Sequence, residues 1–102
     1  MIYVIATIEV VEGKREEYLQ ELHKVIPLVR SEAGCLEYGL VTDEITSLPI
    51  QELAGSQVVT LLERWSDSEA LKAHLQTGHM QSYFAAIASL VKGTRIRVLR
   101  PL

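Results

Sequence analysis

The sequence predicts an α+β domain of the ferredoxin-like class, with the element order βαββαβ. Three observations predict this class. The chain opens with a run of β-branched residues over 2–11. Two later stretches, 14–33 and 66–90, carry apolar residues at the three- and four-residue spacing of amphipathic helices. Three further strand patterns follow, two before the second helix, at 35–43 and 58–65, and one after it, at 94–99. This order is typical of a four-stranded antiparallel sheet with both helices on one face.

The first strand and the first helix follow from a change of period at Gly13. Residues 2–11 are apolar on both alternating faces, so both faces of this strand require cover. From Lys14 to Ala33 the apolar positions form one helical stripe. Pro27 lies inside this helix and is expected to kink it, because proline cannot donate the main-chain hydrogen bond. Gly34 has the chemistry of a helix stop.

The second and third strands are predicted at 35–43 and 58–65, and a long connection joins them. Residues 44–57 contain Pro49 and Gly55 and have no clear period. Connections longer than about 12 residues are uncommon in compact domains and are often functional. We therefore expect this segment to close over a pocket or to reach a partner subunit.

The second helix has a capping box, with Ser66 as N-cap and Glu69 three residues later. An interruption is expected at Thr77 and Gly78, and the helix then continues from His79. Gly93 is expected to end the helical region before the strand at 94–99.

Composition limits the classes of partner. The chain has 102 residues, which suits one domain covering 1–102. A net charge of -3 provides no basic surface for nucleic acid, and no apolar run approaches the roughly 20 residues of a membrane helix. Cys35 is the only cysteine, which favours a reducing, cytoplasmic setting. With 48% hydrophobic residues and one sheet face without a helix, we expect a homodimer.

The stretch Leu62-Glu63-Arg64-Trp65, followed by Ala70-Leu71, His74 and His79-Met80, resembles the antibiotic biosynthesis monooxygenase family, and in particular its small quinol-monooxygenase type. The opening IYVIATIEVVEGKREEY, the motif Gly34-Cys35-Leu36-Glu37-Tyr38 and the closing strand match as well. The resemblance covers the chain except for about 44–56, where this connection is longer than the usual one.

The resemblance implies a dimeric α+β barrel with a pocket between sheet and helices in each subunit. It also implies oxidation of phenols or quinols by molecular oxygen, without metal or flavin. The family includes haem-degrading enzymes, an isomerase-like member and proteins of unknown activity, so membership alone does not define the reaction. The haem-degrading type has an asparagine on the first strand, where this chain has Ala6, and a helix histidine that is absent near Tyr83 and Phe84.

His74, His79 and Trp65 are the candidate catalytic residues. A histidine on the inner side of the second helix is either a hydrogen-bonded structural residue or a base that removes a phenol proton, since oxygen reacts faster with the phenolate. His79, at the restart of the helix, is either a turn residue or a second hydrogen-bond donor. Trp65 is either a core aromatic or a wall on which a planar ligand stacks. The sequence does not decide which histidine is the base.

Tyr83, Phe84 and Glu63 are the candidate substrate-binding residues. Tyr83 and Phe84 belong to the second helix, where a tyrosine hydroxyl can orient an oxygenated substrate. Glu63 shares a strand face with Trp65 and requires a partner if it is buried. No metal site is expected, because His74 and His79 would be about 140° apart on a continuous helix.

The function predicted from these residues is a cofactor-independent monooxygenase that oxidises a quinol or polycyclic phenol with molecular oxygen as co-substrate. The partner is then a small aromatic molecule held in an apolar pocket. Two alternatives stay open at this point. One is a small-ligand-binding or stress-response module without activity, and the other is an isomerase of a small oxygenated metabolite.

Overall fold

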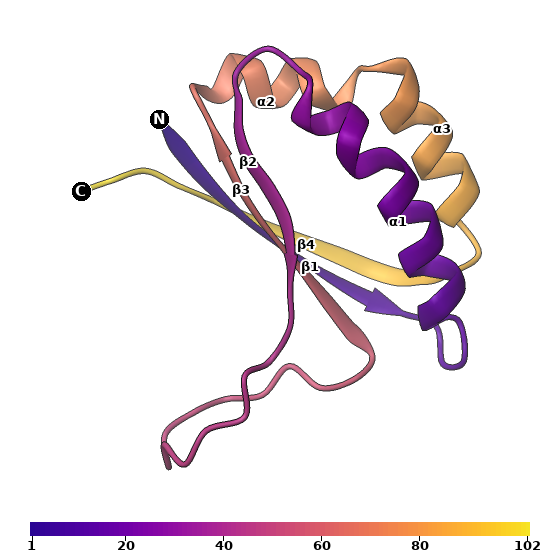
Figure 1. Cartoon of the computed structure of the whole chain (residues 1–102), viewed down its shortest axis with the longest axis vertical. Helices are drawn as coiled ribbons and strands as arrows, with labels where there is room; N and C mark the ends of the chain where they lie inside the picture. Colours follow the sequence, from indigo (N-terminus) through magenta and orange to yellow (C-terminus); the bar gives the residue numbers. More distant parts are fainter.

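The computed structural model describes all 102 residues and contains four strands and three helices. The strands pair in one antiparallel sheet of order β2-β3-β1-β4, and the helices lie on one side of it (Figure 1). The predicted ferredoxin-like fold is therefore confirmed. The elements are β1 (Ile2–Val10), α1 (Arg15–Arg30), β2 (Cys35–Val41), β3 (Val58–Trp65), α2 (Ser68–Leu75), α3 (Gly78–Ile87) and β4 (Val91–Leu99).

The core forms where alternate residues of the two central strands meet the helices. Val4, Ala6, Ile8 and Val10 of β1 are all buried, which is the period-two pattern of a strand with one covered face. They belong to a cluster of 17 buried residues that includes the apolar stripe of α1 and the fully buried Trp65. The helices are thus held by one continuous apolar layer.

The second helical region is divided, as expected, and this division has consequences for the site. α2 ends at Leu75, and α3 begins at Gly78 after the N-cap Thr77, whose side chain accepts from the N–H of Met80. The two parts therefore have separate axes. Side chains five residues apart across this break do not follow the angles of a continuous helix.

Three predicted boundaries are wrong in detail. Asp67, and not Ser66, caps α2, because the Asp67 side chain accepts from the N–H of Ala70 at 2.8 Å. β2 ends at Val41. β4 begins at Val91, so Gly93 lies within the strand, next to the irregular pairing at Glu9, and does not end the helix. Pairing with β1 overrides the weak strand propensity of glycine here.

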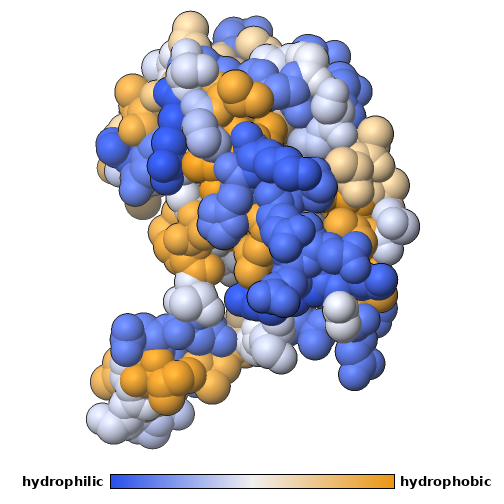
Figure 2. Space-filling view, turned by 45° about the vertical axis from the view of Figure 1, so that its right-hand side comes forward, coloured by the Kyte–Doolittle hydropathy of each residue, from blue (hydrophilic) through white to orange (hydrophobic).

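The connection 42–57, called the arm below, extends away from the sheet and the helices (Figure 1). Its two ends are joined by Asp43, whose carboxylate accepts from the N–H groups of Ala54 and Gly55 at 3.1 and 3.0 Å. Figure 2 shows an apolar patch on the projecting part of the molecule. The exposed apolar side chains of the arm are Ile45, Leu48, Ile50 and Leu53.

The α1–β2 turn passes very close to the start of α2. Gly34 has φ +83°, a left-handed conformation that favours glycine. A Cβ atom at this position would lie 2.6 Å from Cβ of Ala70 and 2.7 Å from Oγ of Ser66. The main chains are joined as well, because the N–H of Ser66 donates to the carbonyl of Gly34 at 2.8 Å. Both torsion and space therefore require glycine here.

No helix of the structure combines the length and the apolar character needed to cross a membrane.

Gly34→Ala is expected to lower the free energy of unfolding by about 3 kcal/mol, because it adds backbone strain to a steric clash. Gly13→Ala is the matched control. Gly13 has φ +81° but open space where a Cβ atom would lie, so only the torsional cost of about 1 kcal/mol should appear. Urea unfolding of both variants measures the difference. Equal losses of unfolding free energy in the two variants would show that the close contact of Gly34 with α2 does not contribute to stability.

Candidate functional site

A largely apolar cavity of about 150 Å³, open on one side, lies between the sheet and the helices. Of its 14 lining residues, 11 are hydrophobic, and they come from all four strands and from α2 and α3. The deep end is formed by Ala6 and Leu61, which are buried. Phe84 and Ile96 are 41% and 49% exposed, so the cavity opens between α3 and β4.

Five side chains with polar groups line this cavity, namely Tyr38, Glu63, His74, Tyr83 and Thr94. Tyr38 and Glu63 are direct neighbours across β2 and β3. Oε1 of Glu63 accepts from the indole N–H of Trp65 at 2.9 Å. Three atoms have no hydrogen bond to the protein, namely Oε2 of Glu63, Nε2 of His74 and the hydroxyl of Tyr38. Every side-chain polar atom that is fully buried does have a hydrogen-bond partner. These three atoms therefore keep accessible surface, as groups available to a ligand do.

The electrostatics of the cavity differ from those of water. Burial raises the pKa of Glu63 to about 7, and the N–H of Trp65 opposes this by stabilising the ionised form. The carboxylate of Glu32 raises the pKa of Glu63 further. Burial also raises the pKa of Tyr38, and the neighbouring Glu63 contributes in the same direction. Anionic groups are thus disfavoured at this end of the cavity.

Glu32 brings the two candidate histidines together. Nδ1 of His74 lies 3.0 Å from Oε2 and 3.1 Å from Oε1 of Glu32, while Nε2 of His79 lies 2.6 Å from the same Oε2. The expectation that these histidines point away from each other is wrong, because α2 ends between them. Glu32 itself was missed by the sequence reasoning. It follows the end of α1 and belongs to no apolar period that would draw attention to it.

Trp65 lies behind the cavity and is not part of its wall. It is 0% exposed, and its ring packs on His74 with centroids 4.7 Å apart and planes 37° apart. Tyr38 contacts the same imidazole edge-on, with centroids 5.5 Å apart. These two aromatic rings therefore fix the plane of His74. Stacking of a ligand on Trp65 stays a prediction, and the Trp65 ring has no exposed surface on which a ligand could stack.

The other candidates occupy different parts of the cavity wall. Tyr83 lines it, but the Tyr83 hydroxyl is bonded to the Tyr18 hydroxyl at 2.6 Å, so both polar atoms have partners. Burial raises the pKa of both tyrosines. Phe84 is at the opening. Arg64 is on the opposite face of the sheet and pairs with Glu37 at 2.8 Å.

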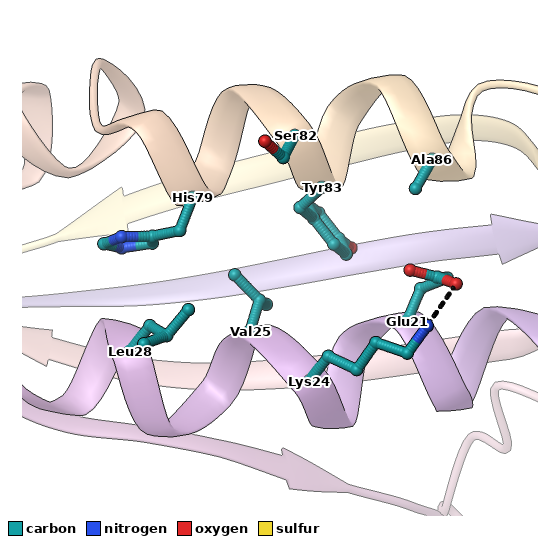
Figure 3. Close-up of a pocket in the computed structure, with 8 residues that line it drawn as sticks. All are labelled: Glu21, Lys24, Val25, Leu28, His79, Ser82, Tyr83 and Ala86. Atoms are coloured by element: carbon teal, nitrogen blue, oxygen red, sulfur yellow. Dashed lines mark hydrogen bonds and ion pairs between the residues drawn. The ribbon is translucent and has the colours of Figure 1, made fainter.

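A second hollow of about 390 Å³ lies on the outside, between α1 and α3 (Figure 3). Val25, Leu28 and Tyr83 supply its apolar wall, and His79 lies at one end. This outer groove is open, and the charges of Lys24 and Glu21 at its other end are paired at 3.0 Å. The inner cavity is the better candidate site, since it combines a largely apolar wall with polar atoms free to bind.

No group of three or more histidine, cysteine, aspartate or glutamate side chains has the arrangement of a metal site. In the Glu32 cluster, the nitrogens that face the carboxylate are engaged in hydrogen bonds to it. Cys35 is a free, half-buried thiol whose pKa is raised by burial.

Comparisons with known proteins identify the family and agree with the fold. The family described as antibiotic biosynthesis monooxygenase matches residues 1–86. The chain belongs to this family. Among curated relatives, the "Probable quinol monooxygenase YgiN" of Escherichia coli is 35% identical over 103 residues, which cover 99% of this chain and 98% of YgiN. YcnE of Bacillus subtilis is 32% identical over 85 residues, or 83% of this chain and 80% of YcnE.

Solved structures of the same fold extend these matches. PA3566 from Pseudomonas aeruginosa superposes with a TM-score of 0.83 at 30% sequence identity, over 99% of this chain and 93% of PA3566. Membership of the antibiotic biosynthesis monooxygenase family, together with the relatives' names, supports an oxidoreductase of the monooxygenase class.

The raised pKa of Glu63 makes stability depend on pH. The folded protein holds this proton up to a pH of about 7, whereas the unfolded chain releases it near the ordinary value of 4.5. Wild type should therefore lose about 3 kcal/mol relative to Glu63→Gln as the pH rises from 4 to 8. This loss of stability should occur between pH 4.5 and 7, and the stability difference should not change above pH 7. Urea unfolding of both proteins across this range measures the difference, and parallel curves would contradict the burial effect.

Proposed function

We propose that the protein is a cofactor-independent monooxygenase that oxidises a quinol with molecular oxygen in the inner cavity. The observation that carries this proposal is the combination of a largely apolar cavity with one imidazole nitrogen, Nε2 of His74, that has no protein partner. A base in such a place can take the proton of a bound hydroxyl while the apolar wall excludes water. The name of the relative YgiN supports the substrate class.

The chain's residues would act on the substrate and not on the oxygen. His74 removes a hydroxyl proton and raises the electron density of the ring. The quinolate then supplies electrons to oxygen, the new ring C–O bond forms, and the second oxygen atom leaves as water. The quinol loses four electrons and becomes a hydroxyquinone, so the oxidation balances the full reduction of one oxygen molecule. No redox group of the protein is required by this balance.

The size of the cavity favours a quinol with one ring. A cavity of about 150 Å³ is the size that accepts a benzene molecule in a protein core, so a polycyclic phenol would have to extend past the opening. Phe84, at the opening, would then contact the outer ring. Glu63 and Tyr38 lie where they can bond the substrate's hydroxyl groups, since both keep a free oxygen at the cavity.

Oxygen consumption by metal-stripped protein, measured with a panel of one-ring and polycyclic quinols, tests this function. Wild type should consume oxygen fastest with a one-ring quinol, in the presence of a chelator. His74→Gln should lower kcat by about 10²- to 10⁴-fold, the range attributed to a general base. His23→Gln is the matched control, because His23 is exposed on α1 and should leave the rate unchanged.

Absence of catalysed uptake from folded protein with every quinol would overturn the oxygenase proposal. The ligand-binding and isomerase hypotheses would then be tested by titrating the same phenols and following the tryptophan fluorescence of Trp65, which packs on His74. Uptake that the chelator abolishes would show that a metal takes part.

We further propose that the protein is a homodimer and acts in the cytoplasm. The outer sheet face has no helix over it, and Tyr3, Val41 and Leu62 on that face are each about 40% exposed. The four exposed apolar residues of the arm add a second uncovered surface. A second copy of the chain would cover both by the same two-fold operation.

Replacing Ile45, Leu48, Ile50 and Leu53 by serine should convert the dimer to a monomer if the arm reaches the partner. Light scattering should then give about 23 kDa for wild type, twice the 11.4 kDa chain, and half that mass for the variant. The arm's own bonds through Asp43 are untouched, so far-UV circular dichroism should not change. A monomeric wild type would refute the dimer, and a dimeric variant would exclude the arm from the interface.

A further inference from the structure

Three side chains form a continuous path from the surface to the cavity. The exposed fraction falls from 24% for the His79 side chain to 10% for Glu32 and 3% for His74. Each contact in the path is a hydrogen bond, at 2.6 Å between His79 and Glu32 and at 3.0 Å between Glu32 and His74. Only His74 reaches the inner cavity, whereas His79 lines the outer groove.

The contact of His74 with Glu32 points to one tautomer of the imidazole. A carboxylate accepts hydrogen bonds, so Nδ1 of His74 must be the N–H donor toward Glu32. In the neutral ring, Nε2 then holds the lone pair and faces the cavity as a base. After Nε2 takes a proton, the Glu32 carboxylate lies beside the imidazolium and compensates its charge. This is the arrangement by which an acidic side chain orients a catalytic histidine.

His79 occupies a different place in the same arrangement. Its Nε2 must also be a donor, because it shares Oε2 of the same carboxylate. A second hydrogen bond to this oxygen restricts the rotation of the Glu32 side chain. His79 cannot contact a substrate in the inner cavity, since it does not line that cavity.

We propose that Glu32 is a positioning residue that holds His74 as the Nδ1–H tautomer with its Nε2 lone pair in the cavity, and that His79 supports Glu32 from the solvent side. The catalytic consequence of this arrangement rests on the proposed function, but the tautomer does not. The two can therefore be tested apart.

Other titratable groups surround the cluster and must be considered in any test. Across the cavity from His74 lie side chains of β2, β3 and α3, and beside His79 in the outer groove lie charged side chains of α1. The groups are Tyr38, Glu63, Tyr83, Glu21 and Lys24. Glu63 and Tyr38 have raised pKa values and Lys24 is paired with Glu21. Glu32 is thus the one carboxylate bonded to either imidazole.

Nitrogen-15 NMR of the histidine rings tests the positioning role directly. In wild type at pH 8, His74 should show the Nδ1–H tautomer. Glu32→Gln keeps an acceptor oxygen and should keep this tautomer, whereas Glu32→Leu removes the acceptor and should give a mixture of both tautomers. Glu69→Gln is the control, because Glu69 is exposed on α2 and pairs only with Lys72.

Steady-state oxygen uptake with a one-ring quinol tests the consequence for catalysis. Glu32→Gln retains the tautomer but not the charge that compensates the imidazolium, so kcat should fall by about 10- to 100-fold with little change in KM. Glu32→Leu should lower kcat further than Glu32→Gln does. His79→Gln should keep the tautomer of His74 and lower kcat by less than about 10-fold.

Different results overturn different statements. An Nε2–H tautomer of His74 in wild type would refute the positioning role, even if neither Glu32 variant folds. The expected tautomers without any oxygen uptake would leave Glu32 as the positioning residue and refute only the quinol monooxygenase. A loss of activity in His79→Gln as large as in His74→Gln would refute the supporting role of His79.

Discussion

The site depends on the contact between two turns, made where the N–H of Ser66 donates to the carbonyl of Gly34 at 2.8 Å. The first turn carries Glu32 at the end of α1, and the second leads from β3 into α2, which carries His74. Glycine at position 34 lets the two main chains approach without a side chain between them. A carboxylate and an imidazole that are 42 residues apart thereby come within hydrogen-bond distance.

The molecule contains one buried carboxyl group, Glu63, and one partly buried carboxyl group, Glu32, whose surroundings differ. Glu32 is hydrogen-bonded to two imidazoles, while Glu63 accepts only from the N–H of Trp65 and has its pKa raised to about 7 by burial. Opposite environments of this kind separate the roles of titratable groups in one site. Glu32 contacts His74 from behind, and Glu63 can be neutral near pH 7 and donate a proton or a hydrogen bond inside the cavity. A neutral hydroxyl-bearing ligand suits such a cavity better than an anion.

The sequence predicted the fold well because each element carries its own period. The two-residue alternation of β1 and the helical stripe of α1 report burial directly, and the interruption at Thr77 is marked by its cap and the following glycine. His74 and Glu63 were found because each shares a face with apolar residues. Glu32 was not found, since it lies in a turn where no period applies and its partners are distant in sequence. The error at Gly93 has the same origin, because strand pairing with β1 is a tertiary contact.

The same reasoning explains why the angle between His74 and His79 could not be taken from the helix alone. A five-residue spacing separates two side chains on a continuous helix, but the break at Gln76 and Thr77 gives α3 its own axis. A single interruption thus brings two otherwise divergent histidines to one oxygen of Glu32. It also places one imidazole in the cavity and the other at the outer groove. The break in the helix is therefore what brings both imidazoles to Glu32, since on a continuous helix the two histidines would lie on different faces.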